Sequence, residues 1–68
     1  MFALTSRENE IMTLICQGLT NNEIAKLLFI SKHTVKAHIC AIMEKFNTKS
    51  RAGAVYIYCK NILFKINA

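Results

Sequence analysis

The segment from Lys32 to Cys40 carries the side chains of this sequence that are best suited to bind another molecule. If the segment is helical, its apolar residues Val35 and Ile39 share one face. The opposite face is small, polar and positively charged near its N-terminus, and it holds Lys32, His33, Lys36, Ala37 and Cys40. Side chains and amide groups at a helix N-terminus can bind phosphate. The pattern therefore indicates a helix that binds a phosphate-rich partner.

Two capped helices can position this face. Thr20 and Glu23 have the spacing of a capping box, so a first helix should begin at Asn21. Ser31 is a second N-cap residue, which leaves room for one short helix and a tight turn before the next helix. The apolar residues Ile24, Leu27 and Leu28 recur at helical spacing in the first helix, and Val35, Ile39, Ile42, Met43 and Phe46 do so in the second. The spacing predicts a helix-turn-helix over about 21–40, with a recognition helix over about 32–46 that enters the DNA major groove.

Two further helices complete the predicted fold. Thr5 and Glu8 form another capping-box pattern, so a helix should begin near Ser6 and end before Gly18. Its inward stripe is Ile11, Leu14 and Ile15. A last helix should start near Arg51, with Ser50 or Thr48 as its cap, and run to about residue 64. The 68 residues contain no Pro and only two Gly, so we predict one all-α domain of four helices over residues 1–68. Whether Glu8 pairs with Arg51 is open at this stage.

Several spaced motifs together resemble a known family. They are Leu4-Thr5-x-Arg7-Glu8, Gly18-Leu19-Thr20-Asn21-x-Glu23-Ile24-Ala25, Ile30-Ser31-x-x-Thr34-Val35-Lys36-x-His38 and Ser50-Arg51-x-x-Ala54-Val55. Over about residues 4–59 the chain is similar to the LuxR-type (GerE-like) DNA-binding domain, the output domain of many bacterial response regulators and quorum sensors. The resemblance implies a transcription regulator of that four-helix helix-turn-helix fold. It also implies that Lys36, Ala37 and Cys40 face the bases and that the last helix is the dimer contact.

The candidate DNA-binding residues follow from these two lines of reasoning. They are Lys32, His33, Thr34, Lys36, Ala37, His38, Cys40, Asn22 and Lys49. Thr34 could donate to a phosphate or cap its own helix, and we leave these alternatives open. His38 lies at the border of the buried face, so packing is at least as reasonable as DNA contact. Cys40 offers little hydrogen bonding, so we leave open whether it touches a thymine methyl or makes no base contact. Phe29 stands where helix-turn-helix proteins often have Gly, which leaves the turn geometry open.

The last helix is apolar around more of its circumference than one core requires. We predict a homodimer interface on Val55, Tyr58, Cys59 and Ile62. The alternative is an apolar helix that normally contacts another domain.

Charge and cysteine content narrow the function classes. The net charge of +5 divides into −1 for residues 1–30 and +6 for residues 31–68, so the positive charge lies with the predicted recognition helix. Cys16, Cys40 and Cys59 are far apart in the sequence, and we interpret them as buried thiols in a reducing cytosol rather than as redox sensors. No segment resembles a signal peptide or approaches the ~20 apolar residues of a membrane span, so we expect a cytoplasmic protein.

The sequence argues against catalysis. It has no Asp, no Gly-rich phosphate loop and no convincing pair of nucleophile and base. His33, His38 and Cys40 lack a fourth ligand, so neither a zinc site nor a cofactor is expected.

Three functions therefore remain. The first is a dimeric regulator that binds double-stranded DNA at inverted repeats, with RNA polymerase as a further candidate partner. The second is a promoter-recognition module like region 4 of sigma factors. The third, from a different class, is a helical module that binds a protein or a membrane surface.

Overall fold

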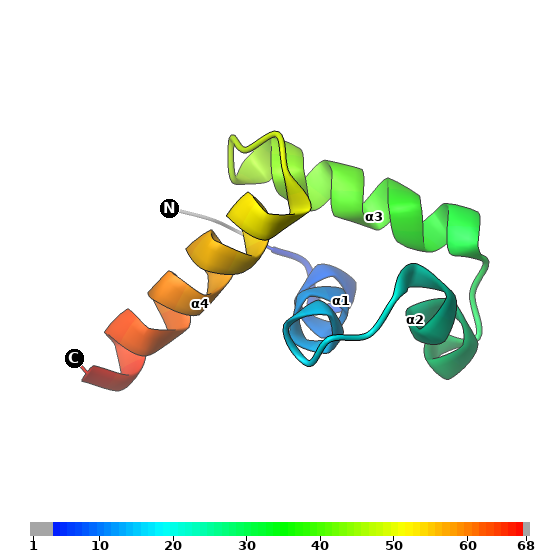
Figure 1. The fold of residues 1–68 in the computed structure, drawn as a ribbon, viewed down its shortest axis with the longest axis horizontal. Coiled ribbons are helices and arrows are strands. Elements are labelled where there is room, and N and C mark those ends of the chain that lie inside the picture. The colour runs from blue at the N-terminus through cyan, green and yellow to red at the C-terminus, as the bar shows by residue number, and fades with distance from the viewer. Residues whose placement is uncertain (1–3, 68) are drawn as a thin grey trace.

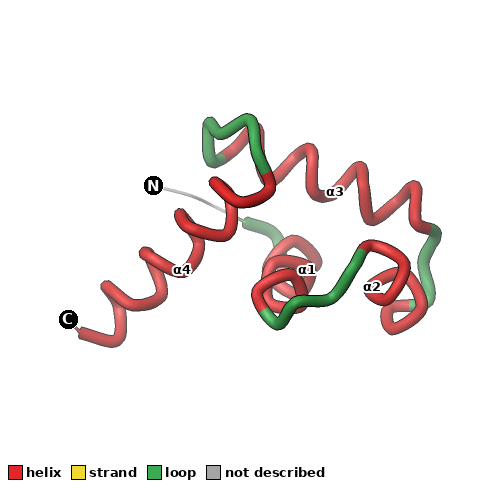
Figure 2. Tube along the Cα trace, viewed as in Figure 1, coloured by secondary structure: helices red, strands yellow, loops and turns green. Residues whose placement is uncertain are grey.

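Four α-helices and no strand make up the described chain in the computed structural model, which covers residues 4–67 and the side chains of residues 4–61. The helices are α1 (Ser6–Cys16), α2 (Asn21–Leu28), α3 (Lys32–Lys45) and α4 (Arg51–Asn67). The predicted all-α fold is thus confirmed. In Figure 1, α1 and α2 lie beside each other beneath the long α3, and α4 runs back from the end of α3 past α1. Short loops join the helices (Figure 2), so each helix must pack on its neighbours.

Side-chain caps set where the helices begin. Thr5 accepts a hydrogen bond from the Glu8 amide at 3.1 Å, and the Glu8 carboxylate accepts from the Thr5 amide at 2.9 Å. Thr20 and Glu23 make the same reciprocal pair at the start of α2, at 3.2 and 2.8 Å. Ser31 caps α3 through the Thr34 amide at 3.0 Å. These bonds satisfy amides that have no partner inside the helix, and they confirm the predicted starts.

The sequence offers two residues, Ser50 and Thr48, as the cap of α4. The Ser50 hydroxyl accepts from the Gly53 amide at 2.9 Å, so Ser50, and not Thr48, is the cap. A side chain at position 53 would collide with the hydroxyls of Thr48 and Ser50. A larger residue at position 53 would require both hydroxyls to move, including the Ser50 hydroxyl that caps α4.

One core joins all four helices. It consists of Ile11, Met12, Ile15, Ile24, Ala25, Val35, Ile39, Ile42, Phe46 and Ala54. The predicted inner face of α3 is confirmed, although Met43 is only partly buried. Met12 was not predicted. Leu27 recurs at helical spacing with Ile24 and Leu28, but 55% of it is exposed. With only eight residues, α2 has room for a narrow buried stripe, and Ile24 and Ala25 fill it.

Three turns place residues in left-handed backbone conformations, and one of these residues is Asn47, after α3, with φ 55°. Gly18, after α1, has φ 92°, as predicted for a helix-ending glycine. Phe29, which ends α2, has φ 57° and ψ 43°. A residue with a Cβ is strained there, and its side chain is 93% exposed. The turn between α2 and α3 therefore adopts a left-handed conformation at a residue other than glycine.

Polar groups fix the relative positions of the helices. The Glu8 carboxylate, on α1, accepts from the Lys45 ammonium of α3 at 2.6 Å. The pairing of Glu8 with Arg51 left open by the sequence is therefore absent. Arg51 instead donates to the Asn21 side chain at 2.6 Å and to the Leu19 carbonyl at 3.1 Å. It thereby ties the first turn of α4 to the loop that precedes α2.

Candidate DNA-binding interface

The outward face of α3 is open along its length. Lys32, His33, Lys36, Ala37 and Cys40 are all exposed. On the inward face, Val35 has no exposed surface and Ile39 retains 7%. The packing of α3 on α1 and α2 thus leaves the basic face free for a partner. Within α3 the only acidic residue is Glu44, near the C-terminal end, so no acidic side chain of α3 itself lies beside the lysines of its N-terminal half.

Two candidates on α3 have more than one role available. The Thr34 hydroxyl lies 2.8 Å from the Ser31 hydroxyl, within the cap of the helix. Thr34 therefore takes part in local capping, yet it remains exposed. His38 is half-buried at the edge of the outward face. Its position therefore allows both roles that the sequence left open, packing within the domain and contact with DNA.

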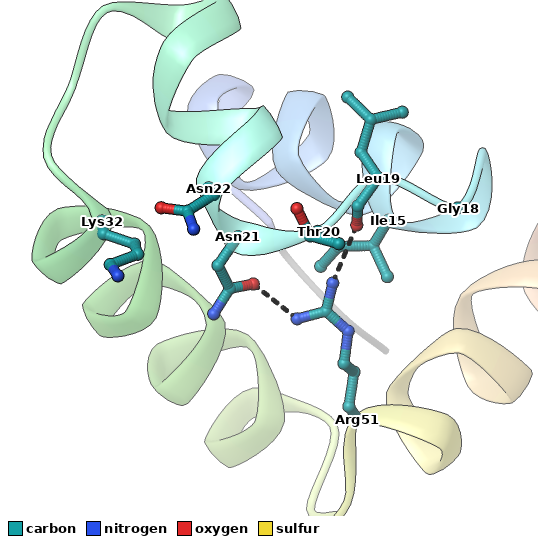
Figure 3. A pocket seen from close by; sticks show the side chains of 8 residues that line it. All are labelled: Ile15, Gly18, Leu19, Thr20, Asn21, Asn22, Lys32 and Arg51. Carbon is teal, nitrogen blue, oxygen red and sulfur yellow. Dashed lines mark hydrogen bonds between the residues drawn. The ribbon is translucent and has the colours of Figure 1, made fainter.

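An open depression of about 560 Å³ lies between the start of α2 and the start of α3. Asn22 and Lys32 line one side of it, and Arg51 lines another (Figure 3). The Arg51 guanidinium is turned toward Leu19 and Asn21, as the dashed lines show. Arg51 thus holds the backbone around the start of α2. Asn22 and Lys32, both exposed, supply polar groups at the rim.

The ninth candidate, Lys49, is exposed in the loop between α3 and α4. Lys45 is different, because its ammonium is bonded to Glu8. Sequence reasoning did not identify the positioning roles of Lys45 and Arg51. The sequence pointed to Arg51 through the family motif and left a pairing with Glu8 open, but its partners in the structure are Asn21 and Leu19.

The predicted dimer residues of α4 lie partly against the same chain. Val55 and Tyr58 are half-buried and pack on the core. The Tyr58 hydroxyl donates to the Asn9 side chain at 3.3 Å. The side chain of Ile62 lies outside the described residues. Tyr56, by contrast, is 66% exposed, and the Lys60 ammonium lies 5.9 Å from the centre of its ring. The outer face of α4 is therefore amphipathic, and the dimer residues remain a prediction.

The three cysteines are more exposed than the sequence analysis predicts. Cys16 and Cys40 are exposed and Cys59 is half-buried, so the interpretation of all three as buried thiols is wrong. Cys16 ends α1, and Cys40 lies on the outward face of α3. The Cys16 and Cys59 sulfurs lie 3.8 Å apart, although 43 positions separate the two residues in the sequence. Partial burial of its sulfur, together with the neighbouring Cys59 thiol, raises the pKa of Cys16 to about 11.

Among the described residues, no three His, Cys, Asp or Glu side chains gather to form a metal site. No helix in the same part of the chain is long and apolar enough to cross a membrane.

Comparison with known proteins identifies the family. The family model described as bacterial regulatory proteins, luxR family, matches residues 3–58. This chain belongs to the LuxR family. It is 48% identical over 52 residues to the spore germination protein GerE of Bacillus subtilis, covering 76% of this chain and 70% of GerE. The chain is thus a DNA-binding domain of LuxR-family transcription regulators, which are not a family of enzymes.

Longer LuxR-family proteins match over one part of their length. The nitrate/nitrite response regulator protein NarP of Escherichia coli is 42% identical over 55 residues, which is 81% of this chain and 26% of NarP. The crystal structure of the response regulator ChrA, from a heme-sensing two-component system, has a TM-score of 0.85 and 38% identity, and the match covers 93% of this chain and 31% of ChrA. The chain spans about a quarter of the length of NarP.

Proposed function

We propose that this LuxR-family domain binds duplex DNA at specific sequences, with α3 in the major groove, and does so as a homodimer on inverted repeats. The observation that carries the proposal is the division of α3 into two faces. One face is buried in the core and fixes the helix, while the other presents Lys32 and Lys36 to solvent. A rigid helix with a free basic face is the form in which helix-turn-helix proteins enter the major groove.

The polar groups around the start of α3 are suited to the DNA backbone. Lys32 and Asn22 border the depression beside the starts of α2 and α3, and helix N-termini favour anions. His33, Thr34 and Lys49 are exposed and can add contacts to neighbouring phosphates. Such contacts set the orientation of the domain on the duplex and make its affinity depend on salt.

Base recognition in this proposal depends on the centre of the outward face. Lys36 is the only cation there and can donate to guanine. Ala37 and Cys40 are small, so they permit close approach and apolar contact with a thymine methyl. His38, at the edge of the face, adds a contact where the groove wall comes near. Readout by one helix extends over only a few base pairs, which favours a dimer.

A dimer would form through α4. Its outer face carries Tyr56 and Lys60, and the half-buried Val55 borders it. An isologous contact between two α4 helices imposes two-fold symmetry on the DNA site. The half-sites should then be inverted repeats with centres about one helical turn, ~10 bp, apart.

The test of DNA binding is Lys36→Ala. Selection of bound genomic fragments supplies the site, and fluorescence anisotropy then measures affinity for it and for unrelated duplexes. Loss of a base contact should weaken specific binding roughly 5- to 150-fold and relax the preference at one base pair, because such a contact contributes about 1–3 kcal/mol. Lys26→Ala is the matched control, since Lys26 is an exposed lysine of α2 outside the proposed interface. Unchanged affinity of Lys36→Ala on every duplex would contradict the proposed orientation of α3.

A further inference from the structure

Two thiols that are remote in the sequence touch each other at the contact between α1 and α4. The Cys16 sulfur belongs to the last residue of α1, and it lies 3.8 Å from the Cys59 sulfur of α4. We propose that Cys16 and Cys59 form a reversible disulfide under oxidising conditions, which makes this pair a redox-modification site that fastens α4 to α1. The site lies apart from the proposed DNA-binding face on α3, and its chemistry does not depend on DNA.

The geometry requires only a small movement. A disulfide has a sulfur–sulfur distance of about 2.05 Å, so the two atoms must approach by about 1.7 Å from their separation of 3.8 Å. Rotation about the bond from Cα to Cβ carries a cysteine sulfur over a larger distance than this. Cys16 is exposed, so a small oxidant can reach it. Closure therefore calls for side-chain rotation together with a slight shift of α4.

The reaction balances with a small-molecule disulfide, such as oxidised glutathione, as the oxidant. One cysteine thiolate attacks the oxidant, which gives a mixed disulfide and releases one glutathione thiolate. The second cysteine thiolate attacks the protein sulfur of that mixed disulfide and releases the second glutathione. The cysteine pair loses two electrons, the oxidant gains them, and the two thiol protons end on the two glutathione molecules.

The redox compartment and the thiol pKa decide how readily the pair closes and reopens. In reducing compartments disulfides are mostly transient and redox-sensing. Partial burial of its sulfur and the neighbouring Cys59 thiol hold the pKa of Cys16 near 11, so at neutral pH little of it is thiolate and closure should be slow. Cys40 provides an internal contrast, because it is exposed on α3 and has no thiol neighbour among the described side chains. It can react with glutathione but cannot close a disulfide within the domain.

Closing the disulfide should stabilise the fold measurably. It would join residues 43 positions apart and so restrict the unfolded chain strongly. Native-like disulfides of this kind raise the folding equilibrium constant roughly a hundredfold. For a domain of this size the melting temperature should rise by roughly 10 °C or more.

The test uses the Cys40→Ser variant, which retains the pair and removes the third thiol. The protein is incubated with oxidised and reduced glutathione at several ratios and mildly alkaline pH, quenched by alkylation, and measured by intact mass spectrometry. We expect a monomer that has lost two hydrogens and carries no glutathione, and a non-reduced digest that contains the peptides of Cys16 and Cys59 joined. The melting temperature, followed by circular dichroism, should rise on oxidation and return on reduction.

Two matched variants distinguish closure from ordinary thiol reactivity. Cys40→Ser combined with either Cys16→Ser or Cys59→Ser leaves one thiol, which should only take up glutathione or join two chains. The reduced forms of all three variants should melt cooperatively, which separates failure to fold from failure to close. If the intact pair gives only glutathione adducts or linked chains, or closes without a rise in melting temperature, the proposed site is refuted.

Discussion

α3 and α4 both pack on α1, but through different kinds of contact. α3 presents Ile39, Ile42 and Phe46 to the core, each with 7% or less of its surface exposed, and adds the ion pair of Lys45 with Glu8. Among the described side chains of α4, only Ala54 is buried. Val55, Ile57 and Tyr58 pack on the core but stay partly exposed, and the Tyr58 hydroxyl and the pair of thiols add further links of α4 to α1. The helix proposed to read DNA is therefore held rigidly by a dry contact, whereas the helix proposed to dimerise keeps surface for a partner.

The largest expected effect tests the free surface of α4. Tyr56→Glu should lower affinity for the paired DNA site at least about tenfold, because it removes an aromatic contact and buries a carboxylate in the proposed interface. Binding to an isolated half-site should change less than about threefold. A glutamate at this position can pair with Lys60 one turn later, so the helix itself is preserved. Titration of both duplexes, followed by gel shift, measures the difference.

Tyr56→Phe is the matched control, since it keeps the ring. Val55→Glu and Tyr58→Glu are less suitable tests, because both residues also pack on the core and would destabilise the monomer. Equal losses on paired and isolated sites, with the variant folded by circular dichroism, would mean that α4 serves another contact and not a dimer.

The next largest effect is expected when the contact of α3 with α1 is weakened, and it is measured as a loss of stability. Burial raises the pKa of the Glu8 carboxyl, but hydrogen bonds from Lys45 and Thr5 and the charge of Lys45 outweigh it, so the pKa is lowered from 4.5 overall. A lowered pKa in the folded state stabilises the fold at neutral pH, and this stabilisation is lost as pH falls below 4.5 toward the lowered value. Glu8→Gln should lower the free energy of unfolding by roughly 1–2 kcal/mol at neutral pH and flatten its decline in acid.

Urea unfolding over a series of pH values makes this measurement. Glutamine can still accept the Thr5 amide, so the cap survives and the ion pair is what changes. The control is Glu10→Gln, which breaks the exposed pair of Glu10 with Arg7 at 3.5 Å and should cost less than about 1 kcal/mol. An equal, pH-independent loss in both variants would show that the pair with Lys45 does not hold α3 to α1.

The difference between local and long-range contacts explains which parts of the structure the sequence could predict. The helix starts depend on residues three positions apart, such as Thr20 and Glu23, so local chemistry suffices to place them. The two faces of α3 follow from helical spacing in the same way. By comparison, the contact of Lys45 with Glu8 spans 37 positions and that of Cys16 with Cys59 spans 43. These contacts depend on how the helices cross, which no local pattern states.

The smallest expected effect concerns the polar link of α4 to α1. The Tyr58 hydroxyl donates to Asn9 at 3.3 Å and lies 3.4 Å from the Thr13 hydroxyl. Both distances are long for hydrogen bonds between oxygens, and both groups are exposed to competing water. Tyr58→Phe should therefore change the free energy of unfolding by less than about 0.5 kcal/mol in urea titrations. Its ring remains packed on the core, so only the hydrogen bond of the hydroxyl is removed.

A loss above about 1.5 kcal/mol that vanishes in the Asn9→Ala background would show that the Tyr58 hydroxyl and Asn9 are coupled. In that case α4 would be held as firmly as α3, and the contrast between the two helices would fail.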